Sequence, residues 1–112
     1  MKIGIDIQEV REFQNMERIF SNAELEYINS KGIHARQTAT GLYCAKEAFF
    51  KALGTGIQLS KLPLVEILHA KQGAPYYNIK DKTLMSDGLH TSLSISHTKT
   101  TAVAMCIISI IT

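Results

Sequence analysis

Hydrophobic and polar residues alternate strictly at the start of the chain. Ile3, Ile5 and Ile7 fall on one face of an extended segment, and Gly4 and Asp6 fall on the other. A period of two residues is typical of a strand that is buried on one side. The pattern therefore predicts a half-buried strand over residues 2–8 that carries one acid.

Two short helices are predicted to follow. Residues 9–20 place apolar side chains near helical spacing, with Arg11 and Arg18 among the polar positions, which indicates a short amphipathic helix with a basic rim. The stretch from Ser21 to Glu24 matches a capping box, in which each side chain binds the backbone amide of the other residue. A second helix should therefore start at about residue 22 and end near Gly32, because glycine readily adopts the left-handed conformation that closes a helix.

A long helix is predicted over residues 35–53. Gly41 is the only glycine in this span, no proline interrupts it, and apolar residues recur at steps of three and four. Gly54 provides the stop.

The rest of the chain has the character of strands. Four apolar runs are separated by turn-forming residues, and the last two runs form a hairpin around residues 98–100. The runs are LVEILHA at 64–70, PYYNI at 75–79, TSLSISH at 91–97 and TAVAMCIISII at 101–111. The predicted fold class is α+β, with an antiparallel sheet packed against the long helix and shorter helices near the N-terminus.

The last predicted strand is apolar on both faces. Its odd positions include Val103, Met105 and Ile107, and its even positions include Ala102 and Cys106. Antiparallel sheets usually leave one face in water, so a strand that needs cover on both sides in a small chain indicates that a second subunit supplies it.

Length and composition favour one domain. A chain of 112 residues, 46% hydrophobic and 20% charged, can bury one modest core, so we expect a single domain over residues 1–112. The longest apolar run, residues 102–108, is far shorter than the roughly 20 residues of a membrane helix. The alternating N-terminus also differs from a signal peptide. These features predict a soluble, cytoplasmic protein without a membrane partner.

Charge and cysteines narrow the class of function further. A formal net charge of +2, without a dense run of Lys and Arg, argues against nucleic-acid binding and is compatible with anionic small molecules or an acidic partner. Cys44 and Cys106 lack the paired spacing of a zinc or redox motif. We expect both to be buried free thiols in a reducing compartment.

An acid and a base stand out in the long helix. Glu47 precedes Lys51 by one helical turn, shares a stripe with Tyr43 and Gly54, and is joined by Asp6 as a second candidate acid. An acid on the buried edge of a helix needs a partner or a cation. The alternative is an ordinary surface ion pair between Glu47 and Lys51.

Two further segments allow more than one interpretation. The backbone amides of Gly54 to Gly56 are unobstructed and suit a phosphate, although such a tripeptide can equally be a helix stop. His97 ends a predicted strand on the face of Leu93 and Ile95, so it is either a core histidine or a ligand at the rim.

Four motifs occur together in a known order. GIDIQEV at 4–10, SNAELE at 21–26, AKEAFFKALGTGI at 45–57 and SISHTKTTAVA at 94–104 closely resemble holo-acyl-carrier-protein synthase, the small bacterial type of 4′-phosphopantetheinyl transferase. The resemblance runs over nearly the whole chain and implies the fold of that family.

The resemblance implies transfer of 4′-phosphopantetheine from coenzyme A to a serine of apo-acyl carrier protein, with release of 3′,5′-ADP, in fatty acid biosynthesis. It implies magnesium as the cofactor, held by Asp6 and Glu47, a count of carboxylates that suits this ion. Lys51 would bind the phosphates or assist the leaving group. The serine proton would pass to Glu47 through a bound water, or to His97.

The remaining implied contacts are those to coenzyme A and to the carrier protein. Gly54, Thr55, Gly56, His97 and Thr98 are expected to contact coenzyme A. The family is a homotrimer with active sites between subunits, which agrees with the two-faced last strand.

Carrier binding is the part of the resemblance with the most departures. Arg11 and Arg18 are expected to meet the acidic carrier. The family commonly has an arginine where this chain has Glu12, and residues 13–17 form a shorter segment than usual. Leu42 also replaces the arginine of the family pattern GRFAAKEAF.

Two alternative functions remain open. One is a transferase for the carrier of a secondary pathway, and the other is a non-catalytic trimeric module that binds coenzyme A or a nucleotide. The presence of Asp6, Glu47 and Lys51 together argues against loss of catalysis.

Overall fold

The computed structural model describes residues 1–110, so residue 111 of the last predicted strand lies outside the described part. Within residues 1–110, three 3-10 helices, two α-helices and five strands follow one another. In order they are β1 (Lys2–Glu9), η1 (Met16–Arg18), α1 (Asn22–Asn29), η2 (Gly32–His34), α2 (Ala35–Leu53), η3 (Leu59–Leu64), β2 (Val65–His69), β3 (Pro75–Ile79), β4 (Leu89–His97) and β5 (Thr101–Ile110).

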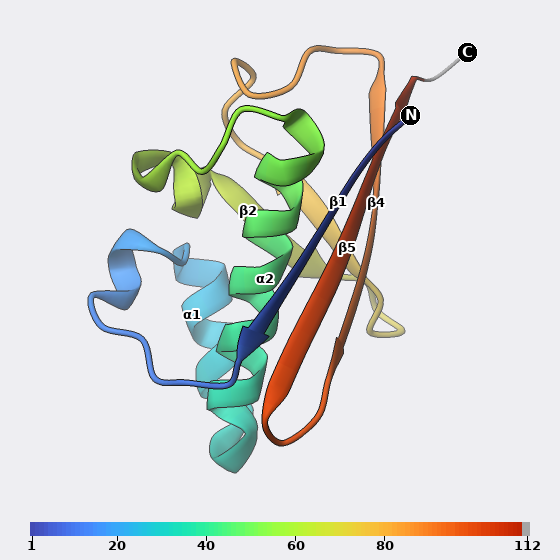
Figure 1. Ribbon diagram of the computed structural model, residues 1–112. Helices are drawn as coiled ribbons and strands as arrows, with labels where there is room; N and C mark the ends of the chain where they lie inside the picture. The colour runs from blue at the N-terminus through green and yellow to red at the C-terminus, as the bar shows by residue number, and fades with distance from the viewer. Residues whose placement is uncertain (111–112) are drawn as a thin grey trace.

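The strands form two antiparallel sheets. A three-stranded sheet has the order β1-β5-β4, and β2 pairs with β3 in a two-stranded sheet. Figure 1 shows α2 lying between the three-stranded sheet and α1, and α2 packs on all three strands of that sheet. The predicted α+β architecture is therefore confirmed, and the division into two sheets adds to it. No helix within residues 1–110 is both long and apolar enough to cross a membrane.

Helix α2 has the predicted bounds and lies unusually close to β1. It ends where Gly54 adopts a left-handed conformation, with φ of 78°. A Cβ atom on Gly4 would lie 1.9 Å from the Ala48 carbonyl oxygen and 2.5 Å from the Ala52 amide nitrogen. The absence of a side chain at Gly4 thus allows backbone contact between β1 and α2, which brings Asp6 close to the helix.

The core lies between the three-stranded sheet and the helices. It contains Phe49 and Phe50 of α2, Phe20 before α1, and the inward residues of β5. Cys44 and Cys106 are buried free thiols within this core, as predicted.

The N-terminal helices differ in part from the prediction. The capping box is present, because Ser21 Oγ accepts from the Glu24 amide at 3.2 Å and Glu24 Oε1 accepts from the Ser21 amide at 2.8 Å. The amphipathic helix expected over residues 9–20 is wrong: only Met16–Arg18 are helical, directly after Asn15 with its left-handed φ of 51°. Helix α1 ends at Asn29, next to the predicted stop at residues 30–32, and Gly32 has the expected left-handed φ of 55° but lies at the start of η2.

Strand β1 is buried on one face, but the buried face is the polar one and the apolar face is exposed. Gly4 and Asp6 point toward α2, whereas Ile3, Ile5 and Ile7 are exposed. These isoleucines lie beside Ile107, Met105 and Val103 of β5 across the outer face of the sheet. A single chain therefore leaves a continuous apolar strip uncovered.

Candidate active site

Asp6 is held at the contact between β1 and α2. The residue is 5% exposed, and its two carboxylate oxygens have different partners. Lys51 Nζ donates to Oδ1 at 3.0 Å, and Gln8 Nε2 donates to Oδ2 at 2.9 Å. The Lys51 side chain is half exposed, so its ammonium group lies at the edge of the site where a charged ligand can reach it.

Glu47 lies one turn before Lys51 on α2 and is only 7% exposed. Within residues 1–110 its carboxylate has no Lys, Arg or His nitrogen within 4.0 Å, because Lys51 binds Asp6 instead. The surface ion pair between Glu47 and Lys51, an alternative left open by the sequence, is not formed. A buried carboxylate without a cationic partner carries a desolvation cost that a bound cation would offset.

Tyr43 and Cys44 show that the two carboxylates share one region. Burial, with a contribution from Glu47 and a smaller one from Asp6, raises the pKa of Tyr43 to about 12. Burial, with contributions from Asp6 and Glu47, raises the pKa of the Cys44 thiol to about 12. Both groups therefore stay protonated at neutral pH beside a negatively charged pair.

The donor set fits a hard divalent cation. Two carboxylates from adjacent elements match the one or two that Mg²⁺ usually takes from protein, with the remaining positions filled by phosphate and water. Within residues 1–110 no group of three or more His, Cys, Asp and Glu side chains is arranged to hold a metal. Asp6 and Glu47 supply two hard oxygen donors that could hold such an ion.

Gly54 to Gly56 lie at the C-terminal end of the same helix. All three residues are exposed, and Gly54 and Gly56 have left-handed φ values of 78° and 74°. The side chains that would cover the backbone are absent at two of the three positions. Lys51 in the last turn of α2 is the nearest charged residue along the chain. The Gly54 amide is not free, because it donates to the carbonyl oxygens of Phe50 and Lys51 at 3.0 and 3.2 Å, which leaves the Thr55 and Gly56 amides as candidates for a ligand.

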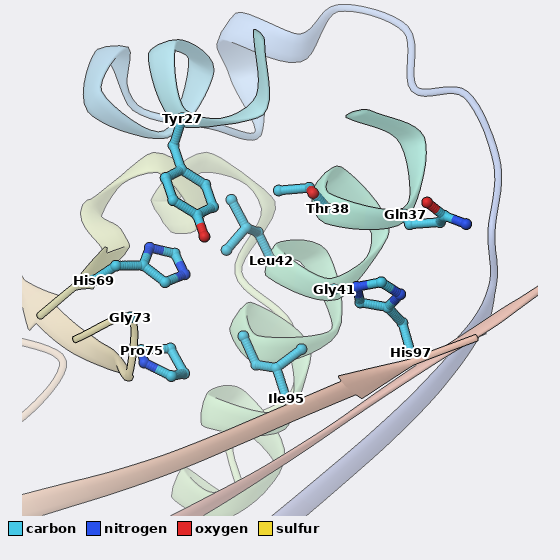
Figure 2. A pocket seen from close by; sticks show the side chains of 10 residues that line it. All are labelled: Tyr27, Gln37, Thr38, Gly41, Leu42, His69, Gly73, Pro75, Ile95 and His97. Carbon is cyan, nitrogen blue, oxygen red and sulfur yellow. The ribbon is translucent and has the colours of Figure 1, made fainter. Parts of the chain in front are cut away.

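His97 is exposed at the end of β4. Of the two interpretations that the sequence allowed, a core histidine is therefore excluded and a histidine at the rim remains. It lines a hollow of about 180 Å³ between α1, α2, β4 and the β2–β3 turn. Figure 2 shows His97 and Ile95 on one side of this hollow, with Tyr27 and His69 on the other. The rings of Tyr27 and His69 stack at 3.9 Å with an angle of 9° between their planes.

Tyr27 and His69 were not predicted as site residues. They are 42 positions apart in the sequence, and no motif relates a helix position to a residue at the end of β2. Burial, together with the charge of Lys31, holds the pKa of His69 below its usual value, so this ring favours its neutral form. A neutral stacked pair offers a flat surface at the edge of the hollow.

The predicted site residues lie on different elements of the chain. Asp6 and Ile95 both pair with Ala104 of β5, and His97 pairs with Ala102, so Asp6 and His97 lie near the same level of the sheet, two strands or about 10 Å apart. Asp6 is on edge strand β1 and His97 is on the opposite edge strand β4, with β5 between them and α2 packed across all three. Gly41 lines the hollow of His97, and Gly54 is 13 residues further along α2, which corresponds to about 20 Å of helix. Thr98 lies beyond His97 in the turn that joins β4 to β5.

Comparison with known proteins decides the family. The family model described as the 4′-phosphopantetheinyl transferase superfamily matches residues 2–106. The chain belongs to this superfamily. The family predicted from the motifs is therefore confirmed.

Individual members of the superfamily match over nearly their full length. A holo-[acyl-carrier-protein] synthase of Treponema denticola is 37% identical over 117 residues, covering 95% of each chain. The crystal structure of a holo-(acyl-carrier-protein) synthase of Bacillus anthracis in complex with CoA (3′,5′-ADP) is 32% identical, with a TM-score of 0.79 over 96% of this chain and 94% of that chain. The synthase of Neisseria meningitidis is 28% identical, with a TM-score of 0.82 over 96% and 97%.

In this phosphopantetheinyl transferase chain, Arg11 and Arg18 line different hollows. The Arg11 guanidinium lies 4.0 Å from the centre of the Phe13 ring and 5.2 Å from that of Tyr43, beside a hollow of about 280 Å³. Arg18 lines another hollow, formed with η3. The two arginines thus contribute to different parts of the surface.

The two departures from the transferase pattern have different structural settings. Glu12 forms an exposed ion pair with Arg36 of α2, so its charge is locally balanced. Leu42 is buried and lines the hollow of His97. An apolar side chain therefore stands where the family pattern has a charged one.

Proposed function

We propose that this protein transfers 4′-phosphopantetheine from coenzyme A to a serine hydroxyl of apo-acyl carrier protein, releasing 3′,5′-ADP, as a step of fatty acid biosynthesis in the cytoplasm. The names of the matched synthases and the CoA complex of the Bacillus anthracis structure support the reaction. The observation that carries the proposal is the buried carboxylate of Glu47, which lacks a cationic partner within residues 1–110 and acts on the same neighbours, Tyr43 and Cys44, as Asp6 does.

Magnesium is the proposed cofactor, and Asp6 and Glu47 are the residues that would hold it. Their hard oxygen donors, their burial and their shared influence on Tyr43 and Cys44 support this assignment. When bound, the ion would neutralise the charge that develops on the phosphates of coenzyme A during transfer.

The protein's own residues would position the phosphates and move one proton. Lys51 would exchange its bond to Asp6 for one to a phosphate oxygen, and the amides of Thr55 and Gly56 would bind the same ligand. The serine oxygen forms a bond to the β-phosphorus while the bond from that phosphorus to the oxygen of 3′,5′-ADP breaks. The serine proton passes to Glu47 through a water molecule, or to His97.

A homotrimer with active sites between subunits is the proposed assembly. The apolar strip of β1 and β5 on the outer face of the sheet supports it. Monomeric proteins rarely expose a continuous apolar surface of this kind. A neighbouring copy would cover the strip.

The acidic carrier protein would dock near Arg11 and Arg18. The hollow beside Arg11 has an apolar floor with charged residues at its rim, an arrangement that suits the amphipathic surface of a protein partner. Arg36 extends the basic rim beyond the residues that the motifs predicted.

A non-catalytic binding module is not favoured, because such a protein would have no use for a buried carboxylate without a counter-ion. The decisive experiment is incubation of the protein with coenzyme A, Mg²⁺ and an apo-acyl carrier protein. We expect intact-mass analysis to show the carrier gaining one phosphopantetheine group, with an equal amount of 3′,5′-ADP released. Binding of coenzyme A with no mass gain, on any of several apo-carriers, would contradict the proposal.

A further inference from the structure

Glu24 and Lys46 form an ion pair that is entirely buried, with both side chains 0% exposed. Lys46 Nζ donates to Glu24 Oε1 at 2.7 Å and to the carbonyl oxygens of Leu62 and Val65 at 2.9 and 2.8 Å. An ammonium group has three protons, so its donor capacity is fully used. Lys46 directly precedes Glu47 in the chain.

The acid of this pair is also saturated with partners. Glu24 Oε1 accepts from the Ser21 amide at 2.8 Å, and Glu24 Oε2 accepts from the Ile67 amide at 2.9 Å. The pair therefore joins α1, α2, the end of η3 and β2 through directional bonds. The segment that ends at Leu62 and Val65 begins with Gly54 to Gly56, the predicted phosphate-binding residues.

Stability alone is a weak reason to bury two charges. Desolvation of an ion pair offsets much of its Coulomb attraction, and apolar residues of similar volume often stabilise a core as well or better. Both side chains are 0% exposed, so neither charge keeps contact with water. The directional bonds of the pair fix the orientation of the groups that it joins, and apolar residues would not do so.

Helix α2 is constrained on two sides. On one side Gly4 of β1 touches the backbone at Ala48, which fixes the distance between strand and helix. On another side Lys46 is tied to α1 and β2. Adjacent residues of an α-helix point about 100° apart, so fixing Lys46 also fixes the direction of Glu47.

We propose that the Glu24–Lys46 pair is a positioning device for the active site, which sets the rotation of α2 about its axis and thereby the direction of the Glu47 carboxylate. Only the expected change in kcat rests on the proposed function, because the orientation of α2 can be observed in the protein without ligands. Neither residue touches the reacting groups.

The test uses the double variant Glu24→Gln/Lys46→Met, which removes both charges and nearly preserves both shapes. We expect it to fold, with a crystal structure in which α2 has rotated and the contact between Lys51 Nζ and Asp6 Oδ1 is lengthened or lost. Calorimetry should show Mg²⁺ affinity reduced about tenfold, and kcat should fall about tenfold or more with little change in KM for coenzyme A. A folded double variant with the Lys51–Asp6 contact, Mg²⁺ affinity and kcat of the wild type would overturn the proposal.

A matched control is available in the ion pair between Glu66 and Lys80. Its acid is also buried, with 4% exposure, but the pair joins Glu66 of β2 to Lys80, the residue directly after β3. Glu66→Gln/Lys80→Met should leave kcat and Mg²⁺ affinity unchanged, and an equal loss there would show that both effects come from general loosening.

A second variant covers the case in which the double variant does not fold. Glu24→Asp keeps the charge but is one methylene shorter, so its carboxylate cannot reach Lys46 and the Ile67 amide together. We expect this variant to fold with reduced kcat and a weakened Lys51–Asp6 contact, and wild-type values of both would overturn the proposal. If the wild-type protein has no transferase activity but the active-site geometry of the variants shifts as expected, the proposed function is refuted and the positioning role of the pair is not.

Discussion

Lys51 binds Asp6 across the β1–α2 contact and leaves Glu47, one helical turn before it, without a cationic partner within residues 1–110. Spacing on the helix favours the other pairing, since i,i+4 acid–base pairs are common on helix surfaces. The close approach of β1 places Asp6 within reach of the lysine instead. One positive charge thus faces two buried carboxylates, and this imbalance is what a divalent cation would correct.

We expect Glu47→Gln to stabilise the protein while nearly abolishing transfer. The amide preserves the shape of the side chain but removes a buried charge that has no counter-ion, so the melting temperature should rise by a few degrees, equivalent to about 1 kcal/mol. Activity should fall about 100-fold or more, because a charged oxygen ligand for the metal is lost. Thermal unfolding and intact-mass assays of the carrier check the two effects.

Asp6→Asn is the informative comparison for that experiment. It should lose activity to a similar degree, but it removes the partner of Lys51, so no gain in stability is expected. If Glu47→Gln lost stability and kept its activity, Glu47 would be a structural residue and the metal assignment would be wrong.

The sequence predicted α2 and the later strands well because local signals determine them. Gly54 and the three- and four-residue steps of apolar residues mark α2, and the capping box marks the start of α1. The loop before α1 was predicted as a helix because Phe13 and its apolar neighbours have helical spacing. In the structure they pack against the core from an irregular segment, with Asn15 in a left-handed conformation.

The parts that could not be predicted depend on contacts between distant segments. Nothing in the alternation of β1 reveals that its glycine and aspartate side faces α2, because the cause is the tight fit of Gly4 on Ala48. The stacking of Tyr27 on His69 has the same origin, since it joins two elements that are far apart in the sequence. Motif order identified the candidate residues, and tertiary packing determines which of them meet.

Gly4→Ala should be strongly destabilising. Its Cβ would lie 1.9 Å from the Ala48 carbonyl oxygen, a backbone atom that cannot move without shifting α2. We expect a loss of about 3 kcal/mol or more in the free energy of unfolding, measured by urea denaturation. Gly41→Ala is the control, because its Cβ would meet only the movable Ile95 side chain at 3.0 Å and alanine favours the helix. Equal losses in the two variants would contradict this account of the β1–α2 contact.

Stability should decline at alkaline pH through the buried acids of the core. Folding raises the pKa of Cys44 from 9.0 to about 12, of Cys106 from 9.0 to about 11 and of Tyr43 from 10.0 to about 12, in each case mainly by burial. The unfolded chain then loses these protons first, so the free energy of unfolding is at its full value below about pH 9 and falls as pH rises toward 12.

The contribution of Cys44 can be isolated by substitution. Cys44→Ala should make the decline between pH 9 and 12 shallower in urea denaturation, even if the variant is less stable at pH 7 because of lost packing. A decline of the same steepness in the variant would show that Cys44 is not protonated in the folded protein at these pH values.

Met105→Glu should disrupt the proposed trimer. The side chain is 41% exposed on the outer face of β5, so in a monomer the glutamate would remain in water and cost little. Light scattering should report a trimer for the wild type and a monomer for the variant, with loss of transfer because the proposed active sites lie between subunits. Ile33→Glu, at an exposed isoleucine of η2, is the control and should remain trimeric. A fully active wild-type monomer would refute the assembly.

Carrier docking should depend on the balance between Glu12 and Arg36. If the acidic carrier meets the basic rim beside Arg11, raising the ionic strength should increase KM for the carrier, because exposed charges are screened over about 10 Å at 0.1 M salt. KM for coenzyme A should change less. Arg11→Gln should weaken carrier binding and reduce its salt dependence, with a smaller effect from Arg18→Gln because Arg18 lines a different hollow.

Removing the charge of Glu12 and removing the charge of Arg36 should have opposite effects on carrier binding. Glu12→Gln removes a negative charge that faces the acidic partner and frees the Arg36 guanidinium, so KM for the carrier should fall by a few-fold. Arg36→Gln leaves Glu12 unbalanced and should raise KM for the carrier by a similar factor. Steady-state kinetics at low and high salt measure both, and both effects should fade as the salt concentration rises. If the two variants change KM in the same direction, or leave it unchanged at low salt, the carrier docks on another face of the molecule.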